Sequence, residues 1–152
     1  MKFHIRERAK HGRLVLILFS IYLLVVLYIT VFRFGVHYTE RRINLTIFRD
    51  LINVYNKNGI GQFLWLLIGN IAWFVPFGFF LPVILKSNGF IKTVAFGFTF
   101  SFAIELLQYV FYKGVAELDD LLLNTLGVTM GYFLFCIVLR CKRERERKHK
   151  QE

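Results

Sequence analysis

Cysteine and histidine are scarce in this chain of 152 residues, and their positions exclude several kinds of chemistry. Cys136 lies inside a long apolar run and Cys141 follows shortly after it, so they form neither a disulfide framework nor a cysteine-based zinc site. The histidines are His4, His11, His37 and His149, and all of them lie outside the apolar runs. These runs therefore lack the usual metal ligand and proton shuttle. We expect no metal, no cofactor and no histidine-based catalysis.

Acidic residues are also few: the chain has 10 Asp and Glu but 20 Lys and Arg. Hydrophobic residues make up 56% of it. The mean hydropathy of +0.50 is that of an integral membrane protein. Runs with little or no charge cover residues 14–32, 58–85, 93–112 and 121–139. A helix of about 20 residues crosses about 30 Å of hydrocarbon. We predict an all-α, polytopic membrane bundle of four transmembrane helices, at about 14–32, 62–85, 93–112 and 121–139.

The first and second apolar runs each admit another interpretation. The run 14–32 follows a basic start, as in a signal peptide, but it exceeds the usual length of about 7–15 residues and no small-x-small cleavage site follows it. We therefore expect it to remain as an anchor. The run 58–85 is longer than one span needs. It fits either one tilted helix with an interfacial lead-in or a helix broken near Pro76.

The basic residues are distributed unequally between the two sides of the predicted membrane. Fourteen of the 20 lie before residue 14, between the second and third runs, or after residue 139. Because positive charge accumulates on the cytoplasmic side, we expect residues 1–13 and 140–152 to be basic cytoplasmic segments flanking a membrane domain at 14–139. Anionic lipid headgroups account for the charges next to the last span, so we expect no nucleic-acid partner.

Glu105 is an ionisable side chain inside the third apolar run. Placing such a group in a bilayer costs about 2.5–3.5 kcal/mol, so it usually faces a protein interior or a wet cavity and marks a site. Ser101 and Gln108 share its helix face, because they lie four residues before and three residues after it. The alternative for the neutral polar residues is simple hydrogen bonding between helices, worth about 0.6 kcal/mol per contact.

A second polar stripe begins the fourth predicted helix. Asp120 and Asn124 are followed at the same helical spacing by Gly127 and Gly131, and Asp119 precedes them. Two glycines four residues apart permit close approach of membrane helices. Because these glycines continue the polar stripe, we expect Glu105 to face it. With Asn70 of the second run, these residues predict one polar site in the outer half of the membrane.

The segment before the second run has the pattern of an interfacial helix. Its apolar residues recur at helical spacing and are Ile43, Ile47, Phe48, Leu51, Ile52 and Tyr55. We predict an amphipathic helix in the first external loop. Arg41, Arg42 and Arg49 would form a basic rim above the carboxylates, suited to an anionic headgroup. The alternative is a solvated loop whose arginines pair with Glu40 and Asp50.

These motifs together resemble the VanZ-like family of membrane proteins. The matching residues are Asn44, Leu45 and Phe48; Asn70 with Val75-Pro76-Phe77-Gly78 and Pro82; Ser101, Glu105 and Gln108; and Asp119 or Asp120 with Asn124, Gly127 and Gly131. An arginine that the family often carries before the aspartates has no counterpart here, where Lys113 or Glu117 stands near its place. The resemblance adds Asn44 to the candidate site, and Pro76 and Gly78 to the residues expected in helix packing.

The resemblance implies a multi-pass protein of the plasma membrane of Gram-positive bacteria, from a family associated with reduced susceptibility to teicoplanin. Our leading hypothesis is a non-catalytic envelope protein whose polar site binds an anionic lipid-linked molecule, such as a cell-wall intermediate, an envelope polymer or a partner. Membrane lipids are the expected surroundings, and a homo-oligomer is left open.

Two further hypotheses use the same residues differently. The first is a membrane enzyme acting on a lipid or isoprenoid phosphate, in which Glu105, Asp119 and Asp120 hold Mg²⁺ or transfer protons, because oxygen ligands without histidine suit magnesium. The second is a proton-coupled transporter that uses Glu105 as its relay. Four spans without an internal repeat would require that transporter to oligomerise.

Overall fold

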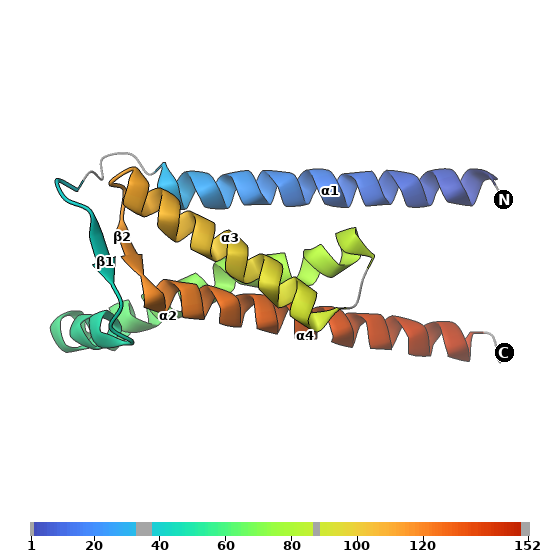
Figure 1. Ribbon diagram of the computed structural model, residues 1–152. Coiled ribbons are helices and arrows are strands. Elements are labelled where there is room, and N and C mark those ends of the chain that lie inside the picture. Colours follow the sequence, from blue (N-terminus) through green and yellow to red (C-terminus); the bar gives the residue numbers. More distant parts are fainter. Residues whose placement is uncertain (1, 33–37, 87–88, 150–152) are drawn as a thin grey trace.

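A computed structural model describes residues 2–32, 38–86 and 89–149, and helices dominate it (Figure 1). The elements are α1 (Lys2–Val31), β1 (Arg42–Asn44), α2 (Arg49–Leu85), α3 (Phe90–Val110), β2 (Val115–Glu117) and α4 (Leu118–Lys148). The four helices are each long and apolar enough to cross a membrane, which confirms the predicted helical membrane bundle. Of the residues used above to assign an orientation, Arg33 and Lys150 lie outside the described residues, as does His37.

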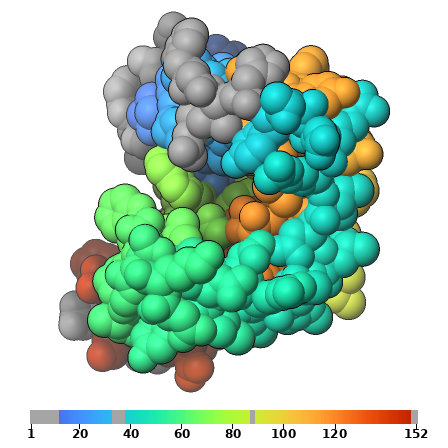
Figure 2. Space-filling view, turned by 90° about the vertical axis from the view of Figure 1, so that its left-hand side faces the viewer, coloured from blue at the N-terminus to red at the C-terminus, as the bar shows by residue number. Residues whose placement is uncertain are grey.

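The second helix is longer than predicted because it includes the amphipathic segment of the loop. α2 begins at Arg49 and continues to Leu85, and the backbone leaves helical geometry at Gly59, where φ is 81°. Pro76 lies inside the helix without ending it, so of the two interpretations of this run, the interfacial lead-in is the one observed. Within the lead-in Leu51 is buried and Ile52 is exposed. The lead-in extends across one end of the bundle (Figure 2).

A small parallel sheet, which the sequence patterns did not predict, lies at this same end. β1 pairs with β2 in a register that places Arg42 opposite Val115 and Asn44 opposite Glu117. We call the end of the bundle formed by residues 38–58 and 111–120 the strand end. Both termini lie at the opposite end (Figure 1). The pairing joins the segment before α2 to the segment after α3.

Glycines bring α2 and α4 into backbone contact along a seam. A Cβ atom added to Gly78 would lie 1.9 Å from the carbonyl oxygen of Val128, and one added to Gly131 would lie 2.0 Å from that of Val75. Gly127 is equally close to α2, with 2.2 Å to the carbonyl oxygen of Ile71. The glycine part of the predicted stripe therefore packs on α2, whereas Asn124 of the same stripe contacts Ser101 of α3. Small residues permit this approach since no side chain separates the backbones.

The core lies between the four helices, and α1 contributes least to it. Phe19 and Val26 of α1 are buried against a cluster that includes Phe77 and Ile104. In the most apolar window of α1, 17% of the residues are buried, whereas the value for α4 is 39%. A hydrogen bond of 2.5 Å from the Tyr22 hydroxyl to a main-chain carbonyl oxygen of α2 crosses the interface between α1 and α2. α1 is thus attached along its second half, from Phe19 to Val31.

Candidate functional site

Five carboxylates gather at the strand end, from four elements of the fold. They are Asp50 of α2, Glu105 of α3, Glu117 of β2, and Asp119 and Asp120 of α4. Glu105 is only 6% exposed, and its Oε2 accepts a hydrogen bond of 2.9 Å from the main-chain N–H of Glu117. Because Glu117 is the residue before α4, this bond fixes the third helix to the start of the fourth.

Asp119 connects the beginnings of α4 and α2. It is 3% exposed, and its two oxygens accept the main-chain N–H of Phe48 at 2.8 and 3.0 Å. Phe48 is the residue before α2 and has a left-handed backbone with φ of 57°, which is uncommon for a residue other than glycine. A carboxylate near the first turn of both helices is also favoured by the helix dipoles. Asp119 therefore has a structural role in addition to any binding role.

Two hydrogen bonds between side chains join three helices below these carboxylates. Asn70 of α2 donates to Asp120 at 2.5 Å, and Asn124 of α4 donates to the hydroxyl of Ser101 of α3 at 2.9 Å. Ser101 and Asn124 are buried. The structure thus brings Asn70, Asp120, Ser101 and Asn124 to one region, although as two separate pairs.

The other predicted site residues lie at the edges of this region. Gln108 donates to the carbonyl oxygen of Thr30 in α1 at 3.1 Å, so it connects α3 to α1. Asn44 donates to a carboxylate oxygen of Asp50 and accepts the Thr46 N–H at 3.0 Å, which shapes the chain between β1 and α2.

Two of the three arginines predicted to form a basic rim contact aromatic rings. The Arg41 guanidinium lies 5.5 Å from the ring centre of Tyr109 and 5.1 Å from that of Tyr112, and Arg42 lies 5.8 Å from that of Tyr38. Arg49 is exposed. Among the described residues, Arg140 and Glu144 form the recorded ion pair, and it lies in the distal part of α4. The rim arginines therefore keep their charge available to a ligand.

Glu117 lies outside the membrane-spanning helices, and its surroundings disfavour the charged form. Burial, followed by the nearby charges of Asp120, Asp50 and Asp119, raises the pKa of Glu117 to about 7. Each of these causes disfavours the charged form. Around neutral pH the Glu117 carboxyl is thus able to donate a hydrogen bond or to accept one.

A pocket of about 370 Å³ opens beside Glu105 and Glu117. Its other lining residues are largely apolar: Ile43, Leu45, Phe102, Leu106, Tyr109, Ala116, Leu118 and Leu121. The surface that the pocket exposes is almost entirely apolar, which suits the hydrocarbon part of a ligand. Within the part of the chain that the structure describes, no group of three or more His, Cys, Asp or Glu side chains is arranged to hold a metal ion.

Sequence reasoning missed three members of this region. Glu117 was considered only as a substitute for an arginine, Asp50 only as a partner of arginines, and Thr30 was not considered. The available signal was the spacing of Glu117, Asp119 and Asp120 around the start of a helix. The Thr30 contact had no signal, because its main-chain carbonyl makes it.

Comparison with known proteins agrees with the motifs. The family model described as VanZ/LLP1 matches residues 19–139. The chain is 29% identical over 124 residues to Protein VanZ of Enterococcus faecium, an alignment that covers 78% of this chain and 71% of that protein. No solved structure matches the chain significantly.

Proposed function

The chain belongs to the VanZ/LLP1 family of membrane proteins, and from this premise we propose that it is a non-catalytic determinant of susceptibility to teicoplanin-type glycopeptides. Its strand end binds an anionic molecule that is linked to a lipid, such as a cell-wall intermediate or an envelope polymer. Binding changes what the cell surface presents to the antibiotic. The observation that carries the proposal is the meeting of carboxyl and amide side chains from α2, α3 and α4 beside an apolar pocket.

In this proposal the basic and acidic side chains of the strand end bind different groups of the ligand. Arg41, Arg42 and Arg49 are exposed and supply positive charge for an anionic group. The carboxyl groups of Glu105 and Glu117, at the side of the pocket, accept hydrogen bonds from hydroxyl or amide groups of the same molecule. A ligand with an anionic group, several donors and an apolar part satisfies all three features.

Binding is favoured over catalysis because all three candidate catalytic carboxylates already accept hydrogen bonds within the fold. Both oxygens of Asp119 accept the Phe48 N–H, and Asp120 accepts from Asn70. A carboxylate that holds Mg²⁺ or transfers protons needs oxygens that reach the substrate. These aspartates serve the packing of α2 against α4.

The proposal places the strand end outside the cell and both termini in the cytoplasm of a bacterium. The basic residues flanking α1 and the end of α4 support this orientation, because they lie at the end of the bundle opposite the strand end. A reporter that is active only in the cytoplasm, fused after residue 152, should be active. If a reporter that functions only outside the cytoplasm is active at this position instead, the proposed orientation is wrong.

The experiment compares Glu105→Gln and Asp120→Asn with Glu144→Gln, an exposed carboxylate far from the strand end. At equal protein levels we expect both site variants to shift teicoplanin susceptibility to that of cells lacking the protein, and to reduce the lipid-linked material retained on purification. Glu144→Gln should behave as the wild type. If both site variants keep wild-type susceptibility and wild-type retention, the proposed binding site is wrong.

A further inference from the structure

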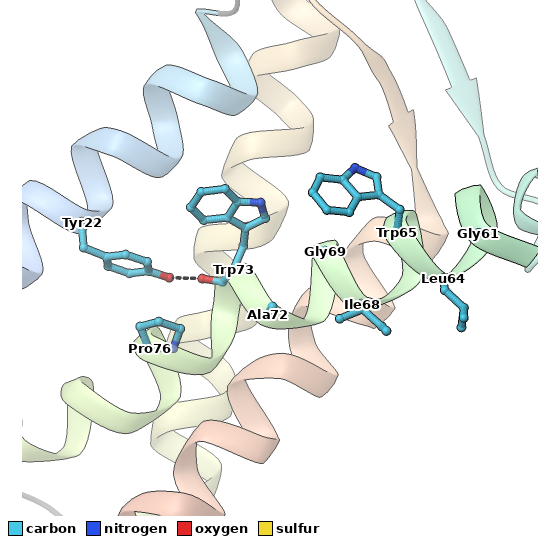
Figure 3. Close-up of a pocket in the computed structure, with 9 residues that line it drawn as sticks. All are labelled: Tyr22, Gly61, Leu64, Trp65, Ile68, Gly69, Ala72, Trp73 and Pro76. Atoms are coloured by element: carbon cyan, nitrogen blue, oxygen red, sulfur yellow. Dashed lines mark hydrogen bonds between the residues drawn. The ribbon is translucent and has the colours of Figure 1, made fainter.

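A second pocket, of about 730 Å³, lies between α1 and α2 and is almost entirely apolar. We call it the Trp groove. Its lining residues are Tyr22, Gly61, Leu64, Trp65, Ile68, Gly69, Ala72, Trp73 and Pro76 (Figure 3). Apart from Tyr22, every one of them belongs to α2. The groove therefore follows one face of the second helix.

An alternation of glycine and tryptophan forms this face. Gly61, Trp65, Gly69 and Trp73 follow one another at intervals of four residues, so they form one row along the helix. They include both tryptophans of the chain. In Figure 3 the two indole rings lie on the same side of α2, and Gly69 lies between them. The result is a notch at Gly69 with an aromatic wall on each side.

No other part of the described chain occupies this notch. A Cβ atom added to Gly61 or to Gly69 would meet no atom within 4 Å, in contrast to the glycines that pack α2 on α4. The end of the groove away from the strand end is closed by Pro76 and by the Tyr22 hydroxyl, which donates to the Trp73 carbonyl oxygen at 2.5 Å. These two glycines therefore do not serve close packing within the chain.

The dimensions of the notch suit a hydrocarbon chain better than another helix. Trp65 and Trp73 are eight residues apart, which corresponds to about 12 Å along a helix axis. The indole rings reduce this opening further, whereas a helix with its side chains is about 10–12 Å wide. A single extended lipid chain is slender enough to enter between the rings and lie against Gly69.

The other end of the groove leads to the polar region. Asn70, the residue after Gly69 in α2, donates a hydrogen bond to Asp120 of α4. Figure 2 shows a hollow in the strand end between α1 (blue) and the first part of α2 (green), with the start of α4 (orange) in its floor. The strand end carries as many acidic as basic residues, but Arg41, Arg42 and Arg49 are exposed whereas Asp119 is buried. These exposed guanidinium groups are the ones that can contact an anionic headgroup.

We propose that the Trp groove holds the single long chain of a polyprenyl-type lipid whose anionic head lies at the strand end. The inference deepens the proposed function and rests on it for the identity of the head. The groove specifies the other half of the ligand, namely one slender hydrocarbon chain. The aromatic walls stabilise this chain by burying apolar surface, and the glycines provide the space.

The test uses two probes, a long-chain polyprenol and the corresponding polyprenyl phosphate, with purified full-length protein in mild detergent. Gly69→Leu places a side chain in the notch, where its Cβ atom meets no protein atom within 4 Å, and Ala95→Leu places the same side chain at an exposed position on α3. We expect Gly69→Leu to weaken polyprenol binding at least tenfold and Ala95→Leu to change it less than twofold. Thermal unfolding should show that both variants are folded. Wild-type binding of polyprenol by Gly69→Leu would overturn the proposal.

The same experiment separates the groove from the headgroup site. The proposed function predicts that polyprenyl phosphate binds more tightly than polyprenol and that Asp120→Asn removes this preference. If polyprenol binding depends on Gly69 but the phosphate adds nothing, the groove stands and the proposed function fails. If Gly69→Leu instead converts a dimer to a monomer in light scattering and leaves polyprenol binding intact, the groove is a contact between two copies and our inference is wrong.

Discussion

The two sides of α2 use glycine for opposite purposes. On the side that meets α4, Gly78 of α2 and Gly127 and Gly131 of α4 carry no side chains that would keep the two helices apart, so main-chain atoms meet directly. Toward α1, Gly61 and Gly69 border open space. The difference teaches that a glycine spaced four residues from another small or aromatic residue in a membrane helix does not by itself indicate helix packing. The size of its neighbours in the row decides whether the surface closes or opens.

The first and largest expected effect breaks the closed side. Gly131→Ala places a Cβ atom 2.0 Å from the Val75 carbonyl oxygen, so α2 and α4 must separate. We expect the free energy of unfolding to fall by about 3 kcal/mol, at the upper end for overpacked cores. The measurement is thermal unfolding in detergent, with Gly12→Ala as the control because no atom lies within 4 Å of its added Cβ. Equal stability of the two variants would contradict the closed seam.

The second prediction loosens the link between the starts of α2 and α4. Asp119→Ala removes both acceptors of the Phe48 N–H, and the loss of such a bond at a helix start costs about 1–2 kcal/mol. Amide hydrogen exchange in the first two turns of α2 should become faster, while exchange near Phe77 should change less. Asp119→Asn keeps one acceptor oxygen, so its exchange rate in α2 should lie between those of the wild type and Asp119→Ala. Unchanged exchange in Asp119→Ala would show that this bond does not hold the helix start.

The third prediction concerns the open side. Tyr22→Phe removes the hydroxyl that bonds the Trp73 carbonyl oxygen, at a cost of about 1 kcal/mol. We expect a small drop in thermal stability and faster hydrogen exchange in α1, with exchange in α4 unaffected. Tyr55→Phe, at an exposed position, serves as the control. An equal change in α4 would mean that α1 is more firmly part of the bundle than its burial indicates.

The fourth prediction is that a glycine-to-alanine substitution on the open side of α2 raises stability, whereas Gly131→Ala lowers it. Gly69→Ala meets no protein atom within 4 Å, and alanine is favoured over glycine inside a helix by about 0.5–1 kcal/mol. The variant should therefore be slightly more stable than the wild type in detergent without added lipid. A loss of stability as large as that of Gly131→Ala would remove the distinction between the two sides of α2.

The smallest effect comes from pH at the strand end. The pKa of Glu117 is raised to about 7 from the 4.5 of an exposed glutamate. Between these values the folded state binds more protons than the unfolded state, so this group makes stability fall as the pH rises from 4.5 through 7. Glu117→Gln should unfold at a temperature that declines less between pH 5 and pH 8. Solvent screening keeps the effect small. An identical decline in the variant would assign it to other groups.

The sequence was sufficient to predict the helices because membrane spans leave a strong signal of length and hydropathy. It also indicated that Glu105 would be buried and that polar residues of several spans would lie near one end. It did not indicate β1 and β2, since three-residue strands have no periodic pattern. Nor did it identify the partner of the Gly127 and Gly131 face, because helical spacing reveals which residues share a face and not which helix that face meets.

The groove shows a different reason for a missed feature. The spacing of Gly61, Trp65, Gly69 and Trp73 is visible in the sequence, but the open space beside them depends on where α1 lies, and Tyr22 bonds α1 to α2 at that place. The rim arginines illustrate the same point. Their charges were predicted, whereas their positions over Tyr109, Tyr112 and Tyr38 depend on how the strands place the loop.

The parallel pairing of β1 with β2 has a consequence for how the protein is made. Arg42 pairs with Val115, so the chain between them, which contains α2 and α3, must be synthesised and inserted before the strands can meet. Glu117 and Asp119 come later still in the chain. A ribosome that has released only the first two helices into the membrane therefore leaves the strand end incomplete, because β1 has no partner strand until the third helix has returned the chain to that end.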